Sequence, residues 1–351
     1  MKEAILSKGR LEEFLGAMGN TAAVYAPVES GQNIVFGAVS GPGAASDGVR
    51  SLRLGASNTR LSVKGLFFPQ REPLFSFRDD AVKAVAEPKA PLVAFGVRPC
   101  DAMALTFLDK VFGPARVGSL KHEDPYYLAR RGAGTVISLG CNKPCSTCFC
   151  TSVGGHPFGI AGTDVLATEL PDGSLLLEAV TEKGQALLDR HAGLFSAPSS
   201  AQLDEKGRIS RAAEAAVRPV HAADAKARAD AAFDSAVWEA LTSSCLGCGA
   251  CTFVCPTCHC FDISDETGGN GEGVRLRSWD SCQYPLFTAH ASGHNPRPAR
   301  RQRMRQRVMH KFSYTPETAG MVSCMGCGRC VAVCPVNLDI REIVAALGAK
   351  P

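Results

Sequence analysis

The chain has 351 residues, of which 45% are hydrophobic and 21% charged, a composition typical of a folded globular protein with about two or three domains. The formal net charge of +4 is small for this length and does not by itself indicate a nucleic-acid partner. No apolar run approaches the roughly 18 residues that a membrane span needs, and the first residues lack the apolar core of a signal peptide. We therefore expect a cytoplasmic protein, and in that reducing compartment its 16 cysteines indicate metal binding rather than disulfide bonds.

The N-terminal part alternates between helical and strand-like patterns. Residues 5–18 place hydrophobic side chains at helical spacing between charged ones. Residues 92–97, LVAFGV, predict a buried strand, followed by a turn and an apolar helix with Asp101 as its N-cap. A second helix, near 126–130, precedes another strand-like run at 134–140, GTVISLG. Strands that alternate with helices predict a parallel sheet.

Two cysteines directly follow the predicted strands. Cys100 and Cys141 lie just past the carboxyl ends of these strands, at the edge where open α/β sheets bind their ligands. Further along, DVLATELPDGSLLLEAVT predicts a hairpin with Pro-Asp-Gly as its turn. We assign residues 1–195 to an α/β domain that includes a cysteine-rich loop at 141–150.

The composition changes after this domain. Residues 196–235 are rich in Ala, Lys, Arg, Asp and Glu and contain few large apolar side chains, which predicts a charged helical connector with a solvent-exposed face. Residues 236–351 contain all the cysteines that lie outside residues 1–195. We expect them to form a separate domain, with an insertion at 256–323.

The spacing C-x2-C-x2-C-x3-C, followed by proline, occurs twice in this last domain. It is the spacing of bacterial two-cluster ferredoxins, in which the fourth cysteine of each run ligates the other cluster. Zinc sites favour two C-x2-C pairs on separate loops and do not need the third cysteine of the run. The pattern therefore predicts two [4Fe–4S] clusters with crossed ligands, the first held by Cys245, Cys248, Cys251 and Cys334 and the second by Cys324, Cys327, Cys330 and Cys255.

These patterns together define the expected fold class. It is α+β or α/β, with an N-terminal α/β domain around a partly parallel sheet and a C-terminal, ferredoxin-like helical domain for two [4Fe–4S] clusters.

The loop CNKPCSTCFC at 141–150 suggests a third iron–sulfur cluster. Its first candidate ligands are Cys141, Cys145, Cys148 and Cys150, although only one residue separates the last two and one of them can be spare. The alternative is a set of free thiols packed as small hydrophobic side chains. The spacing also resembles the cluster loop of radical-SAM enzymes, but the long barrel of that family does not follow. Additional candidate ligands are Cys100, Cys258, Cys260 and Cys282, whereas we expect His259 to be a hydrogen-bonded neighbour of the ligands.

A strongly basic run, RPARRQRMRQRVMHK, occupies residues 297–311. Three interpretations remain open: an exposed helix face, contacts to acidic surfaces of partner subunits or of the connector, and nucleic-acid binding, which the sparse aromatic residues disfavour. If these cations lie near an anionic cluster, they would favour its reduced form and raise its potential. The basic residues are Arg297, Arg300, Arg301, Arg303, Arg305, Arg307 and Lys311.

Several stretches together resemble the dicluster iron–sulfur subunits typified by the beta subunit of sulfhydrogenase and the iron–sulfur subunit of anaerobic sulfite reductase. They are VRPCDAMALTFLDKVF, the CFC of 148–150, CPTCHCFDI, RSWDSCQ, GHNPRP, HKFSY and GCGRCVAVCPV, and the resemblance covers about residues 60–345. It implies an electron-transfer subunit beside a flavoprotein that binds FAD and NAD(P)H. It also implies a catalytic partner of the hydrogenase, sulfite reductase or heterodisulfide reductase type.

The chain lacks sequence fingerprints for binding nucleotides. No G-x-G-x-x-G follows a predicted strand, GPGAASDG at 41–48 has the wrong spacing, and no P-loop or nucleophile elbow occurs. We therefore expect an electron carrier within an anaerobic oxidoreductase complex, with no catalytic residue of its own. Two alternatives remain: a redox enzyme with its own active metal centre at the 141–150 loop, and a cluster-bearing protein that binds nucleic acid.

Overall fold

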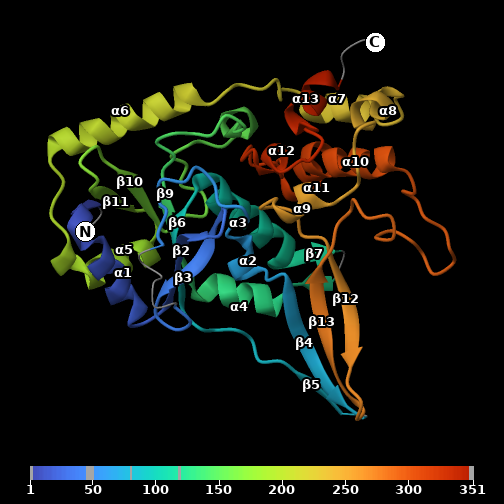
Figure 1. Ribbon diagram of the computed structural model, residues 1–351, viewed down its shortest axis with the longest axis horizontal. Coiled ribbons are helices and arrows are strands. Elements are labelled where there is room, and N and C mark those ends of the chain that lie inside the picture. The colour runs from blue at the N-terminus through green and yellow to red at the C-terminus, as the bar shows by residue number, and fades with distance from the viewer. Residues whose placement is uncertain (1–2, 45–50, 80, 118–119, 348–351) are drawn as a thin grey trace.

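The computed structural model describes residues 3–44, 51–79, 81–117 and 120–347. Its largest element is a seven-stranded mixed sheet with the strand order β1-β11-β10-β9-β6-β2-β3, seen at the left of Figure 1. The strands are β1 (Glu3–Leu6), β2 (Ala23–Ser30), β3 (Asn33–Ser40), β6 (Leu92–Val97), β9 (Gly134–Leu139), β10 (Val165–Glu169) and β11 (Leu175–Ala179).

The centre of this sheet is parallel and its edges are antiparallel. Strands β2, β6, β9 and β10 pair in parallel, whereas β3, β11 and β1 pair antiparallel with their neighbours. The central strands β6 and β9 are almost completely buried, as expected for parallel strands covered on both faces. The predicted α/β fold with a partly parallel sheet is confirmed, and so are both predicted strands and the β10–β11 hairpin.

Helices cover both faces of the sheet. Helices α1 (Leu11–Gly19) and α5 (Glu182–Arg190) pack on one face, and α2 (Lys64–Phe67), α3 (Pro99–Phe112) and α4 (Pro125–Ala133) pack on the other. Short 3-10 turns lie at η1 (Lys8–Arg10), η2 (Cys150–Val153) and η3 (Ala192–Leu194). Met325 of the C-terminal part packs into the core formed by the second group of helices. The sheet and the cysteine-rich part therefore share a hydrophobic core.

Two local predictions near the helices are wrong. Ile5 and Leu6 belong to β1, which pairs with β11, and the first helix begins only at Leu11. A short apolar run can suit either element, and here the sheet edge determines which one forms. Asp101 is not the N-cap of α3, because Arg98 occupies that position and Asp101 lies buried in the first turn. Its carboxylate instead pairs with Arg329.

The predicted connector contains a long helix, α6 (Ser200–Ala216), which begins with a capping box between Ser199 and Gln202. The helix is not solvated on all sides, because Ala213 and the partly buried Leu203 and Ile209 pack against the sheet. In Figure 1 it runs along the upper edge of the α/β part toward the helical part at upper right. The charged face remains outside, while the apolar face is part of the fold.

The C-terminal part is mainly helical. Its helices surround the two ferredoxin loops and are short, except for the arginine-rich α10, which continues into a π-helical turn. They are α7 (Ala225–Ala231), α8 (Val237–Thr242), α9 (Ala250–Phe253), α10 (Arg300–Met309), η4 (His310–Tyr314), α11 (Thr315–Ala319), α12 (Arg329–Ala332) and α13 (Ile340–Ala346).

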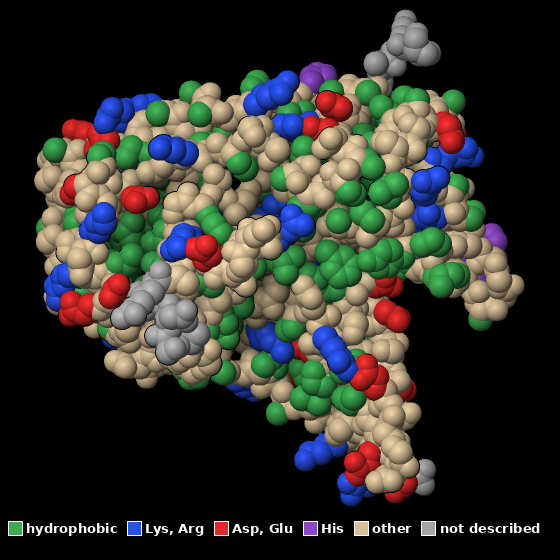
Figure 2. Space-filling view, in the orientation of Figure 1, with side chains coloured by type: hydrophobic (Ala, Val, Ile, Leu, Met, Phe, Trp, Pro, Cys, Tyr) green, Lys and Arg blue, Asp and Glu red, His purple; other side chains and the backbone are tan. Residues whose placement is uncertain are grey.

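A second sheet joins distant parts of the chain. Strands β4 (Arg71–Arg78) and β5 (Ala81–Ala84) pair with β12 (Phe261–Thr267) and β13 (Glu272–Trp279) in the order β12-β13-β4-β5. This sheet, which we call the arm, protrudes at the lower right of Figures 1 and 2. A separate hairpin consists of β7 (Ala115–Val117) and β8 (Leu120–His122).

A buried charge cluster fixes the base of the arm. Glu72 of β4 pairs with Arg277 of β13 and with Arg130 of α4, and Arg277 also pairs with Asp124. The arm takes strands from both the first and the last of the three predicted domains. The predicted division into 1–195, 196–235 and 236–351 therefore remains a proposal.

Candidate metal centres

Two loops of the same design carry the eight ferredoxin cysteines. Each leads into a short helix through a glycine with left-handed backbone, Gly249 before α9 and Gly328 before α12, with φ of +74° and +72°. Glycine adopts this conformation without the penalty that a Cβ atom brings. Each loop can therefore turn sharply just before its helix, and the third cysteine of each run lies on that helix.

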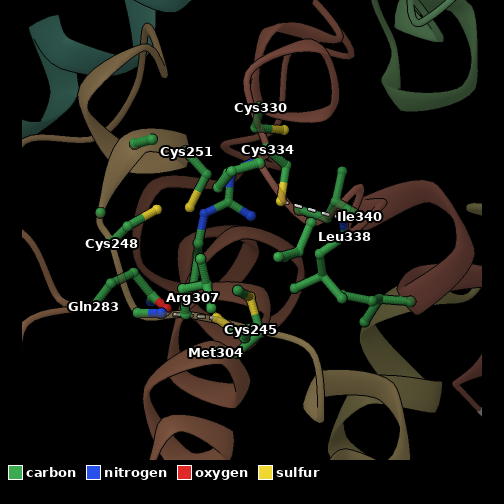
Figure 3. A pocket seen from close by; sticks show the side chains of 17 residues that line it. Cys245, Cys248, Cys251, Gln283, Met304, Arg307, Cys330, Cys334, Leu338 and Ile340 are labelled. Carbon is green, nitrogen blue, oxygen red and sulfur yellow. Dashed lines mark hydrogen bonds between the residues drawn. The ribbon is translucent and has the colours of Figure 1, made fainter.

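The first loop and the end of the second run enclose one cavity. Cys245, Cys248, Cys251 and Cys334 all line it, and Figure 3 shows Cys248, Cys251 and Cys334 pointing into the space around Arg307. The fourth cysteine of the second motif therefore lies beside the three of the first. This is the arrangement that crossed ligation requires, and the ligand assignment itself remains a prediction.

The second predicted set lies deeper in the molecule. Cys255, Cys324 and Cys327 are buried, and Cys330 is partly buried. Cys324 and Cys327 each interact electrostatically with both Cys255 and Cys330, so the four thiols are close neighbours. Burial raises the pKa of the Cys324 thiol to about 11, and a bound metal must replace the proton of such a thiol.

The sulfur atoms are not arranged for a single ion. Within the described ranges, no three histidine, cysteine or carboxylate side chains come close enough together to hold one metal ion. A tetrahedral zinc site needs four ligands converging at bond distance, whereas a four-iron cluster keeps its cysteine ligands around a larger core. The cysteine spacing, and not this absence, distinguishes iron–sulfur clusters from zinc.

Three cations are buried beside these thiols. Lys64, Arg307 and Lys311 are 2%, 4% and 4% exposed, and no carboxylate of the described residues forms an ion pair with any of them. Lys311 Nζ donates to Thr257 Oγ1 at 2.9 Å and to the Ser323 carbonyl at 3.1 Å. Arg307 Nε has no hydrogen-bond partner in the part of the chain that the structure describes. Burying an unpaired charge costs several kcal/mol.

The cysteine groups are the source of negative charge next to these buried cations. Burial alone would lower the pKa of Lys311, but the thiolates of Cys255 and Cys258 hold its pKa above the ordinary value. Arg307 interacts in the same way with Cys251 and Cys330. A cluster with four thiolate ligands is an anion, so the buried cations of Arg307 and Lys311 fit anionic iron–sulfur clusters at these positions. Lys64 differs from them, because burial lowers its pKa to about 8.

The basic run therefore has an interior role. Interpreting residues 297–311 as an entirely exposed face is wrong, because α10 turns Arg303 and Arg307 inward and Lys311 follows them. Only part of the run meets solvent, as at Arg301, which pairs with Glu239. The alternation of inward and outward cations cannot be recognised without knowing that an anion lies inside.

A third group of cysteines lies at the carboxyl edge of the main sheet. Cys100 begins α3, Cys141 follows β9, and both line one cavity with the three cysteines of the adjacent loop, Cys145, Cys148 and Cys150. The structure therefore brings Cys100 to the loop. Cys258, Cys260 and Cys282 do not line this cavity, since Cys258 lies beside Cys255 and Cys260 interacts with Cys282.

Four further polar residues lie at these sites, and only one of them was expected there from the sequence. His259 is partly buried and its Nδ1 lies 2.9 Å from the Thr257 carbonyl. Desolvation lowers its pKa to about 4, so it is a neutral neighbour of the ligands. Gln283 lines the first cavity and donates to Cys282 Sγ at 3.4 Å. Asn58 and Lys64 lie far from any cysteine in sequence, so no local signal indicates their role.

Residues 244–338 match the family model of the 4Fe-4S dicluster domain. Together with the fold, this match identifies an iron–sulfur dicluster protein, and the predicted pair of [4Fe–4S] clusters is confirmed at that level. The chain is 33% identical to the sulfhydrogenase 2 subunit beta of Pyrococcus furiosus over 333 residues, which are 95% of this chain and 94% of the relative. It belongs to the sulfhydrogenase beta subunit family, as the resemblance predicted. In the described part of the chain, no helix has the length and apolarity to span a membrane.

Proposed function

We propose that this chain relays single electrons between a flavoprotein subunit that binds FAD and NAD(P)H and a catalytic subunit of the hydrogenase type. The observation that carries the proposal is that two adjoining cysteine groups differ in their exposure to solvent. Three cysteines of the second group are buried and Cys330 is partly buried, whereas the first group reaches the surface at the exposed Cys248 beside Leu246, which is 58% exposed. An electron on the buried cluster can thus leave through the outer one to a docked partner.

The chain's own residues support this role by binding and charge compensation. The cysteines named above would hold the clusters, which when bound accept and release one electron at a time without bond making. Arg307 and Lys311 offset the added negative charge of reduction, and apolar side chains such as Met304, Leu338 and Ile340 keep water from the first site.

The test is anaerobic reduction of the purified chain with NAD(P)H, with and without its copurified flavoprotein. We expect the cluster absorbance to bleach rapidly only when the flavoprotein is present. Rapid reduction of the isolated, flavin-free chain by NAD(P)H would contradict the proposal. A catalytic partner of the sulfite reductase or heterodisulfide reductase type would reoxidise the reduced complex with its own substrate in place of protons.

A second candidate is a redox enzyme with its own active centre at the 141–150 loop, favoured by the cavity at Cys141. It predicts that the isolated chain, supplied with an artificial electron donor, transforms a substrate. A relay accepts electrons under the same conditions but transforms nothing.

A further inference from the structure

We propose that the cavity at the carboxyl edge of the main sheet holds a third iron–sulfur cluster, in electrical contact with the buried ferredoxin cluster. Its ligands are Cys100, Cys141 and two of the three cysteines in the loop 145–150. The metal site does not depend on the proposed function, whereas its role as a relay does.

The cavity is assembled from elements that the fold places side by side. Strands β6 and β9 are parallel neighbours, so Cys100, at the start of the helix after β6, and Cys141, directly after β9, meet at the same sheet edge. The loop then turns back over them with Pro144 in the wall of the cavity. Five cysteines from two segments of the chain thus line one space, more than packing of inert thiols explains.

A hydrogen-bond donor is already aimed at one of these sulfurs. Asn58 Nδ2 lies 3.3 Å from Cys145 Sγ and 2.8 Å from the carbonyl oxygen of Cys327, and Thr147 Oγ1 lies 3.8 Å from Cys145 Sγ. The other amide atom, Asn58 Oδ1, is buried and has no hydrogen-bond partner among the described residues. Side-chain donors of this kind stabilise thiolate ligands of iron–sulfur clusters.

The cavity borders the second ferredoxin loop directly. The Phe149 amide donates to the Gly326 carbonyl at 2.8 Å, and Cys148 Sγ lies 3.6 Å from the carbonyl oxygen of Cys327. Gly326 packs so closely that a Cβ atom there would lie 2.5 Å from the Cα of Cys150. Cys327, a predicted ligand of the buried cluster, also lines the cavity.

The second cysteine group borders both of the other sites. Cys327 lines the sheet-edge cavity, and Cys330 lines the first cavity. Each transfer oxidises one cluster by one electron and reduces its neighbour by one, and no bond forms or breaks. A cluster held by the second group would therefore connect the sheet-edge cluster with the outer one.

Iron analysis of the whole, anaerobically purified chain tests the proposal. We expect about 12 iron and 12 acid-labile sulfide per chain, and Cys100→Ser or Cys141→Ser should each lower both by about 4, with the ferredoxin signals retained in EPR. The control is Thr106→Ser, which lies on the same helix as Cys100 but does not line the cavity and should keep wild-type iron.

The results that would overturn the proposal are specific. They are about 8 iron in the reconstituted wild-type chain, or wild-type iron in both cavity variants. If a variant misfolds, the wild-type iron content and Mössbauer quantitation of its clusters still decide between three clusters and two. Because these readouts need no partner, failure of the electron relay would leave them unchanged.

Discussion

Arg329 and Asp101 form an ion pair in the interior, with Nη2 and Oδ2 2.6 Å apart and side chains only 3% and 1% exposed. Arg329 begins the helix after the second ferredoxin loop, and Asp101 follows Cys100 at the edge of the main sheet. Arg329 Nε also donates to the Thr59 carbonyl at 2.8 Å. The pair therefore fixes the position of the buried cluster site relative to the sheet.

Breaking this pair should destabilise the whole protein. Asp101→Asn leaves the Arg329 guanidinium buried without a counter-charge, and we expect a loss of about 3–5 kcal/mol in the free energy of unfolding. Denaturant unfolding of the cluster-loaded chain measures it. The control Asp265→Asn removes an exposed pair with Arg275 on the arm and should cost under about 1 kcal/mol. Equal effects of the two substitutions would contradict the structural role assigned to Asp101.

Arg307 should set the potential of the first cluster. Its buried cation favours the more negative, reduced cluster, so Arg307→Gln is expected to lower the midpoint potential by on the order of 60 mV, a tenfold change in a one-electron equilibrium. Redox titration followed by EPR measures the shift. Arg301→Gln, an exposed position on the same helix, is the control and should leave the potential nearly unchanged. An unshifted potential in Arg307→Gln would place the cluster elsewhere.

Crossed ligation predicts which cluster each fourth cysteine serves. Cys334→Ala should damage the cluster of the first loop, because its thiol lines that cavity, and Cys255→Ala should damage the cluster of the second loop. Mössbauer and EPR spectra should therefore show loss of the first-loop cluster in Cys334→Ala and loss of the second-loop cluster in Cys255→Ala. If each variant loses the cluster of its own motif, the ferredoxin pairing is wrong.

The close packing of Gly326 on Cys150 should be intolerant of a methyl group. Gly326→Ala combines a φ of +60° with a clash against backbone, so we expect destabilisation clearly above the roughly 1–2 kcal/mol of left-handed strain alone. Gly293→Ala isolates that strain, because Gly293 has φ of +82° and open space around it. Similar unfolding free energies for both variants would mean that the two loops can separate without cost.

Removing the clusters should reverse the effect of one buried cation. With clusters bound, Lys311→Met should reduce stability, since the anionic centre loses its counter-charge. After iron removal by an anaerobic chelator, the same substitution should stabilise the chain relative to the wild-type apoprotein, because an uncompensated charge leaves the interior. Hydrogen exchange of α10 and the unfolding midpoint, measured with and without clusters, test both the expected loss and the expected gain of stability. A stabilising effect in both states would show that Lys311 does not compensate cluster charge.

Much of this architecture could be predicted from sequence where the signal is local. The strand at 92–97 is a continuous apolar run and the one at 134–140 is rich in β-formers, because both strands are buried on two faces. The ferredoxin loops keep a fixed spacing because their ligands are close in sequence. The inward orientation of Arg307 could not be predicted, since arginine is usually exposed unless an anion lies inside. The position of Lys64 beside the cysteines could not be predicted either, because its contact with the Cys258 carbonyl joins residues 194 positions apart.

The arm has a consequence for how the chain can be made. The contact between Glu72 and Arg277 spans 205 positions, so β4 leaves the ribosome long before its partner strand β13 exists. During that interval the free edge of β4 and the carboxylate of Glu72, which is buried in the folded protein, are exposed. This exposure favours association with other chains. Contacts of such long range also slow folding. A polypeptide cut anywhere in the 196–235 segment would leave β4 paired with β5 alone, and its two halves, synthesised apart, should aggregate before they meet.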